Sequence, residues 1–369
     1  MSIYKEDIFE AKERLKAWWD NEPLDRPCIQ YFCTRSDVKF EGIYDRFHLA
    51  REWDDFEGSL EDFERKSKSY IFGGENIPWY FPNYGAGIMA ALFGVTPKYM
   101  TQTVWFSRPT PVEEIVNLLE SAEMNGNNPW YDRLMRIAEY AAKRSGGNYL
   151  VTLTDLGGIM DILSSFLGPT NIILAMKRQP EIIDASRAII LEKTLKVYDD
   201  LQNIIERYQE GCNCWLNIWC PKRWYPIQSD FSYMLSPKLF KRFVLPDIVA
   251  QAEHMDYAIY HLDGVKQLPF LDDLLAEDSI TGIQWVPGAG KDPKGSDKWM
   301  PVYKKIQAAG KKVVIDNLDG LPKYLSHVYK NLDNKLLMMS QVFLAKNAAD
   351  RFLPEFMGGR SGVRKSKKH

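Results

Sequence analysis

The chain lacks the features that mark several large classes of protein. No apolar run reaches the roughly 18 residues that a membrane span requires, so none is expected. Its 47 basic and 49 acidic residues give a net charge of −2, whereas nucleic-acid-binding proteins carry a basic excess. The N-terminal residues mix both signs of charge and lack the apolar segment of a signal peptide. We therefore expect a cytoplasmic protein that binds neither nucleic acid nor membrane.

Cysteine is also scarce. The chain of 369 residues has 5 cysteines, too few and too odd a number for a disulfide scaffold. Cys212, Cys214 and Cys220 lie close in sequence, but they form no C-x-x-C pair, and this spacing predicts buried free thiols rather than a zinc knuckle. The chain has no P-loop, no G-x-S-x-G elbow, no H-E-x-x-H helix and no G-x-G-x-x-G after an early strand.

Aromatic residues, by contrast, are abundant. They make up 13% of the chain, and many lie beside Gly, Pro or Asn, as in IPWYFPNYG at 77–85 and CPKRWYP at 220–226. Aromatic rings in such loops line a pocket for a planar or apolar ligand, or they fold back as small satellite cores. The sequence leaves both interpretations open.

Strand and helix patterns alternate along most of the chain. After an amphipathic N-terminal helix, the strands are expected at 28–32, 102–107, 148–155, 215–219, 257–263, 280–286, 311–317 and 335–341. Helical patterns between them indicate a parallel sheet, and eight such units predict a closed (β/α)8 TIM barrel. A doubly wound open sheet is the structural alternative.

The remaining segments are predicted to belong to the same single domain or to its tail. Residues 34–100 read as an irregular insertion over the mouth of the barrel, because they lack the apolar periodicity of a core. The barrel is expected to span 1–355, and the basic, Gly-rich tail at 356–369 is expected to be disordered.

Polar residues end several of these strands, where the active sites of barrels lie. His261 and Asp263 share one strand face, and Asp155 ends an earlier strand before Gly157 and Gly158, glycines that would let a ligand approach the backbone. We predict these three as catalytic residues. We also predict a set of residues that bind the substrate: Gln284, Trp285, Gln341, Trp105, Tyr84 and Asp230.

Each of these residues also has a purely structural interpretation. His261 could be a satisfied core histidine, and Asp155 or Asp230 could cap a helix or a turn. Gln284 and Trp285 could serve only in packing.

Four stretches of the chain resemble the uroporphyrinogen decarboxylase-like superfamily. They are RLKAWWDNEPLDRP at 14–27, LGGIMDILSSFLGPTNIILAMKRQPEII at 156–183, SDFSYMLSPKLFKRFVLPDI at 229–248 and YHLDG at 260–264. They occur in the family's order and span most of the chain. The resemblance implies a (β/α)8 barrel, and relatives are often homodimers.

The superfamily holds two chemistries, and the sequence departs from both. Uroporphyrinogen decarboxylases hold substrate carboxylates with arginines in the N-terminal loop, where this chain offers Arg35 and no arginine pair. Corrinoid-linked methyltransferases hold zinc with H-x-C and a distant cysteine. Here the matching positions are His261 and Asp263, with Ser340 and Gln341 near the distant one. His261 and Asp263 are thus the candidate ligands for a metal, zinc in particular.

The resemblance favours a methyltransferase- or demethylase-type enzyme that acts on a small substrate with a corrinoid or thiol partner. The abundant aromatic residues suit an apolar or cationic substrate. The alternatives are a cofactor-free uroporphyrinogen decarboxylase and a barrel that binds a ligand without catalysis.

Overall fold

The computed structural model describes residues 2–35, 47–101, 103–318 and 322–343; the predicted tail at 356–369 lies outside them. Its centre is a seven-stranded sheet in the order β2-β1-β11-β10-β9-β8-β7, parallel except that β2 runs antiparallel to β1. The strands of this sheet are β1 Cys28–Thr34, β2 Tyr70–Gly74, β7 Trp224–Gln228, β8 Tyr257–Asp263, β9 Gly282–Val286, β10 Lys312–Asp316 and β11 Leu337–Phe343.

Two short strand pairs lie outside this sheet. β3 Trp79–Tyr80 pairs in parallel with β6 Leu150–Val151, and β4 Lys98–Met100 forms an antiparallel hairpin with β5 Thr103–Trp105. The chain is therefore an α/β protein with a mainly parallel central sheet.

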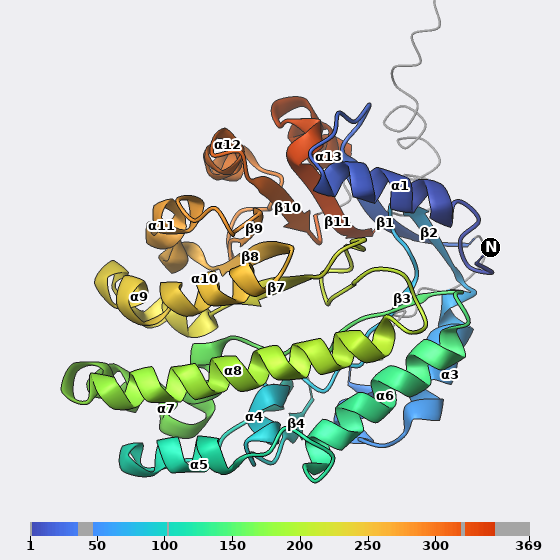
Figure 1. Cartoon of the computed structure of the whole chain (residues 1–369). Helices are drawn as coiled ribbons and strands as arrows, with labels where there is room; N and C mark the ends of the chain where they lie inside the picture. Colours follow the sequence, from blue (N-terminus) through green and yellow to red (C-terminus); the bar gives the residue numbers. More distant parts are fainter. Residues whose placement is uncertain (1, 36–46, 102, 319–321, 344–369) are drawn as a thin grey trace, which may run out of the picture.

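Helices surround the strands, and α9 to α12 lie outside β7 to β10 (Figure 1). Their bounds are α1 Ile8–Trp19, α2 His48–Arg51, α3 Phe56–Ser67, α4 Ile88–Leu92, α5 Ile115–Ser121, α6 Pro129–Ser145, α7 Ile159–Arg178, α8 Pro180–Ile205, α9 Pro237–Phe243, α10 Leu245–His254, α11 Leu271–Leu275, α12 Met300–Ala308 and α13 Pro322–Asn331.

Local chemistry explains where these elements begin and end. α6 starts after Asn128, whose side chain accepts hydrogen bonds from the backbone N–H groups of Trp130 and Tyr131, and ends at Gly146 in the left-handed region. Strand β10, KVVID, is buried along its whole length, as a run rich in branched apolar residues requires in a sheet covered on both faces.

Two of the eight expected strands are wrong. The segment 102–107 contributes only β5, part of a hairpin outside the central sheet, and 215–219 contains no strand. The structure instead has β3, which lies within the aromatic segment at 77–85, and β7, which begins within the one at 220–226. Pro226 within β7 is tolerated because this strand is at the edge of the seven-stranded sheet.

The expectation that 34–100 is irregular is also wrong. Its described residues form α2, α3, α4, β2, β3 and β4. The side chains of Leu60, Phe63 and Ile88 are buried in the same hydrophobic cluster as the strands of the central sheet. The apolar periodicity is there, but in helices of 4 to 12 residues it is hard to recognise.

One described helix, α7, is long and apolar enough to cross a membrane by length and composition alone. Half of its most apolar window is buried inside the protein, where it packs beside α8 (Figure 1). Gly168, with a φ of 72°, interrupts the helical backbone just before Pro169. These features are those of a core helix.

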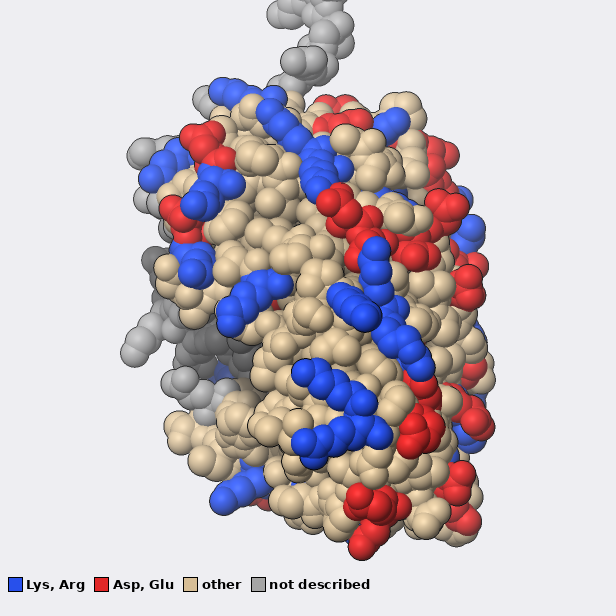
Figure 2. Space-filling model, turned by 90° about the vertical axis from the view of Figure 1, so that its left-hand side faces the viewer, with Lys and Arg blue, Asp and Glu red and all other residues tan. Residues whose placement is uncertain are grey.

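The surface carries both signs of charge. Figure 2 shows Lys and Arg side chains interspersed with Asp and Glu on the same face, in keeping with the net charge of −2.

Candidate functional site

A cavity of about 550 Å³ lies at the carboxyl ends of several parallel strands. Asp155 follows β6, Asp316 ends β10, and Gln341 lies near the end of β11. The segment at 47–104 supplies much of the remaining wall, together with Trp215. The aromatic residues of the wall are Phe32, Phe47, Phe63, Tyr70, Trp79, Tyr80, Phe81, Trp215 and Phe343.

Beside this cavity, three side chains offer metal ligands. The ligand atoms of Asp230, His261 and Asp263 all lie within 4.8 Å of one another. The ring of His261 meets the cavity-lining ring of Trp215 edge to face, with 5.3 Å between centroids. Asp263 also lines a neighbouring hollow with Asn317, which lines the cavity as well. The metal-ligand group and the cavity therefore adjoin.

A chain of polar side chains fixes the His261 ring. His261 and Gln284 are paired in register on β8 and β9, and the Nδ1 atom of His261 lies 2.6 Å from Oε1 of Gln284. The Gln284 side chain also bonds to the carboxylate of Asp316. Lys294 Nζ lies 2.7 Å from Oδ1 of Asp316, and Asn317 donates to Oδ2.

This series of hydrogen-bonded side chains determines which ring nitrogen of His261 is free to bind a ligand. Burial opposes ionisation of Asp316, but Lys294 and the hydrogen-bond donors outweigh it, so the pKa of Asp316 lies below its usual value. A charged carboxylate only accepts hydrogen bonds, so Asp316 faces the NH2 group of Gln284. The Gln284 carbonyl then faces His261. Since a carbonyl only accepts, Nδ1 of His261 carries a proton and Nε2 is the nitrogen left for a ligand.

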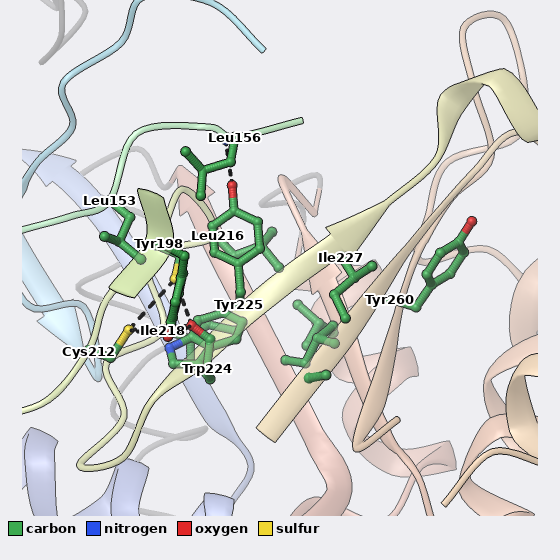
Figure 3. Close-up of a cluster of buried hydrophobic side chains, with 14 of the residues drawn as sticks. Leu153, Leu156, Tyr198, Cys212, Leu216, Ile218, Trp224, Tyr225, Ile227 and Tyr260 are labelled. Carbon is green, nitrogen blue, oxygen red and sulfur yellow. Dashed lines mark hydrogen bonds between the residues drawn. The ribbon is translucent and has the colours of Figure 1, made fainter. Parts of the chain in front are cut away.

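The segment after β6 is held in place by a tyrosine. The backbone N–H of Leu156 donates to the hydroxyl of the buried Tyr225, as Figure 3 shows, at 2.7 Å. The carboxylate of Asp155 accepts from the backbone N–H of Gly157 and from Nε2 of Gln228. Burial, reinforced by the charge of Asp230, raises the pKa of Asp155 to about 7.

The two glycines after Asp155 serve the backbone rather than a ligand. A Cβ on Gly157 would lie 2.5 Å from the carbonyl oxygen of Ala86, and one on Gly158 would lie 2.3 Å from that of Gln228. Gly157 also has a φ of +70°. The close approach predicted from sequence is therefore between chain segments.

Asp161, in the first turn of α7, positions one of the candidate ligands. Its carboxylate accepts from the backbone N–H groups of Asp230 and Phe231 at 3.0 and 2.6 Å, at the start of the short 3-10 helix Asp230–Met234. Burial and the charge of Asp230 raise the pKa of Asp161 to about 7. Asp161 thus ties the loop of Asp230 to α7.

The structure brings most of the predicted polar residues to this region. Asp155 and Gln341 line the cavity, and His261 and Asp263 lie beside it. Asp230, predicted to bind substrate, lies with the two candidate metal ligands instead. Gln284 is buried and contacts His261 without lining the cavity.

The three aromatic residues that the sequence predicted to bind the substrate do not line the cavity, which corrects that prediction. Trp105 is 63% exposed on the β4–β5 hairpin. Tyr84 is buried, with its hydroxyl donating to the carbonyl of Trp53. Trp285 points to the opposite side of β9 from Gln284. It is fully buried there and packs on Trp299.

Sequence reasoning did not single out several residues of the site. Lys294 and Asp161 act through long-range contacts, to Asp316 and to Asp230. Trp215 was assigned to a strand. Asp316 lies near the end of the strand expected at 311–317, and that position is the signal by which the sequence could have identified it.

All five cysteines are free and buried, which for Cys212, Cys214 and Cys220 confirms the prediction. Sγ of Cys212 and Sγ of Cys214 lie 4.0 Å apart, and among the described residues the cysteines form no group of three metal ligands.

Comparison with known proteins gives one informative likeness. No protein-family model matches the chain, and no curated protein matches it in sequence. Among the solved structures that match is a methyltransferase from Methanosarcina mazei, with a TM-score of 0.57 and 12% sequence identity. The alignment covers 90% of this chain and 93% of that one. The two chains share a fold over nearly their whole lengths.

Proposed function

We propose that this protein is a methyltransferase-like enzyme that acts on a small apolar or cationic substrate in the aromatic cavity, with a corrinoid or thiol partner. In this proposal Asp230, His261 and Asp263 hold a divalent metal such as zinc. The observation that carries the proposal is the convergence of these three ligand groups within 4.8 Å beside the cavity. The fold shared with a methyltransferase supports it.

The three residues fit a metal. His261 has its Nδ1 hydrogen bonded to Gln284, the arrangement by which proteins orient a metal-binding imidazole. Two carboxylates and an imidazole are ligands that zinc accepts, and three protein ligands leave a position for a substrate or water. When bound, zinc would lower the pKa of a thiol or water molecule at that position.

Other residues of the chain would supply the remaining functions. Asp155, with a pKa of about 7, can hold or release a proton at neutral pH at the cavity wall. Trp215, packed on the His261 ring, limits the access of water to that side of it.

The proposal includes a closed barrel. The backbone N–H of Glu75 donates to the carbonyl of Ile29 on β1, and that of Leu153 donates to the carbonyl of Asn213. The first bond continues the pairing of β1 one residue beyond β2, and the second joins the segment after β6 to a segment that precedes β7. A crystal structure in which β3 and β6 connect the two edges of the central sheet would bear this out.

The decarboxylase alternative has less support. A tetrapyrrole with eight carboxylates requires several cations. Among the residues that the structure describes, no Lys or Arg side chain lines the cavity, whereas Asp62, Asp155 and Asp316 do.

Metal analysis tests the proposal first. Purified protein is dialysed against zinc at pH 7.5 and compared with His261→Ala and with the control His254→Ala, an exposed histidine that pairs with Asp199 on α8. We expect stoichiometric zinc in the wild type and the control and none in His261→Ala. A wild-type protein that takes up no zinc contradicts the metal site.

Methyl transfer is tested next, anaerobically, with methylcobalamin and a small thiol. The cobalt–carbon bond breaks with both electrons staying on cobalt, the methyl group bonds to sulfur, and the thiol proton is released. We expect cob(I)alamin to appear at a rate that falls in His261→Ala. Zinc binding without methyl transfer, together with formation of coproporphyrinogen from uroporphyrinogen, would favour the decarboxylase instead.

A further inference from the structure

We propose that the ligand of the cavity is an organic cation of the alkylammonium class, with its charge opposite Asp155 and its alkyl groups against the aromatic wall. This inference names the substrate class of the site described above and rests on the proposed function in that respect. It is carried by the shape and the charges of the cavity, and its test requires neither zinc nor methyl transfer.

The wall suits a cation with an apolar surface. Trp79, Tyr80 and Phe81 line the cavity from one segment, and Trp215 lines it near His261. Aromatic faces attract cations through the ring quadrupole, and they also bury the alkyl groups of an ammonium ion. A strongly hydrated ion would lose more solvation in such a cavity than a tetraalkylammonium group does.

Among the residues that the structure describes, one carboxylate of the wall, that of Asp155, has no ion pair. Asp62 is ion-paired with Lys66, and Asp316 with Lys294. The hydrogen bonds to the carboxylate of Asp155 come instead from neutral donors, the Gly157 N–H and the Gln228 amide.

Among the described residues, Asp155 therefore has no ion-pair partner that would favour its ionised form. Without a ligand a proton fills that role, because burial and the nearby Asp230 raise the pKa of Asp155 to about 7. A cationic ligand would replace the proton, so that the charge of the cavity stays the same and one proton leaves the protein. An anionic ligand would face the carboxylates of Asp62, Asp155 and Asp316, and no Lys or Arg among the described residues lines the cavity.

The test uses two probes of the same shape. Choline carries a trimethylammonium group, and 3,3-dimethylbutan-1-ol carries a neutral tert-butyl group in its place. Calorimetric titration of the full-length protein at pH 8 should show choline binding about tenfold more tightly or better. At pH 6 the preference should shrink, because Asp155 then holds its proton more firmly.

Variants locate the charge. Asp155→Asn should reduce the preference for choline to the part that the aromatic wall supplies, and leave the affinity for the alcohol unchanged. Asp200→Asn is the matched control, since Asp200 lies on α8 and bonds to Tyr131 and Lys196. It should keep the preference.

A second measurement needs no variant, in case Asp155→Asn does not fold. Titrations near pH 7 in buffers of different ionisation enthalpy should show release of about half a proton when choline binds, and none when the alcohol binds. Equal affinity for the two probes, binding of neither, binding of choline without proton release, or a preference that is undiminished in Asp155→Asn would overturn the inference. Choline binding in a protein that transfers no methyl group would leave this inference standing and contradict only the proposed function.

Discussion

The side chain of Gln284 offers the sharpest test of how the metal-ligand group is built. Gln284→Leu keeps a side chain of similar size on β9 and removes both of its hydrogen bonds. The Nδ1–H of His261 then loses its acceptor, 2.6 Å away, while Asp316 keeps Lys294 and Asn317. The loss of a hydrogen bond that orients a metal-binding histidine weakens metal affinity about 10- to 100-fold, equivalent to about 1.4–2.7 kcal/mol.

Zinc affinity is measured by competition with a chromophoric chelator at pH 7.5, and thermal unfolding confirms that each variant is folded. Gln284→Glu keeps an acceptor for the Nδ1–H and should bind zinc more tightly than Gln284→Leu. Gln251→Leu is the control, because Gln251 is a buried glutamine on α10 that donates to the carbonyl of Asp247, on the same helix. If Gln284→Leu binds zinc as the wild type does, or if Gln251→Leu loses as much affinity, Gln284 does not orient the ligand.

Two further predictions concern stability. Asp247→Asn should lower the free energy of unfolding by about 1–3 kcal/mol, because the buried Arg187 would lose its two-bonded carboxylate and keep only its ion pair with Asp184. The double variant Arg187→Met, Asp247→Leu should lose less, and urea unfolding that shows the double variant to be the less stable of the two would refute this. Asp155 has a folded-state pKa of about 7 against an ordinary value of 3.8, so the folded state binds the proton more tightly and stability should fall as the pH rises from about 4 to about 7. Asp155→Asn should reduce the slope of Tm against pH between pH 5 and 8, and an unchanged slope would contradict the shift.

Part of this protein could be predicted from local sequence. Strands β8, β9 and β10 are short apolar runs rich in branched and aromatic residues, bounded by polar or small residues, a pattern that identifies a buried parallel strand without knowledge of its neighbours. Alternation along such a strand also placed His261 and Asp263 on one face. The α/β class and part of the site followed from these regularities.

Two strands and much of the wall could not be predicted this way. β3 has only two residues, and β7 contains Pro226 and aromatic residues that read equally well as a loop. Their strand geometry comes from pairing with β6 and β8, partners that lie 33 to 71 residues away along the chain. Propensity has no access to such pairings, since each is stabilised only when the partner is already in place.

The amino-acid sequence by itself determined which segments are apolar enough to form strands and helices, where polar groups end the strands, and that Cys212, Cys214 and Cys220 are buried free thiols. Only the tertiary structure decided which of those polar groups meet. Asp230 joins His261 and Asp263 because Asp161, 69 residues earlier, accepts its backbone N–H. The positive charge of Lys294 favours the ionised form of Asp316. Through the orientation of Gln284, that carboxylate determines which ring nitrogen of His261 is free to bind a ligand. Periodicity records burial within one element, whereas these contacts depend on distances between elements, which are set when the whole core packs.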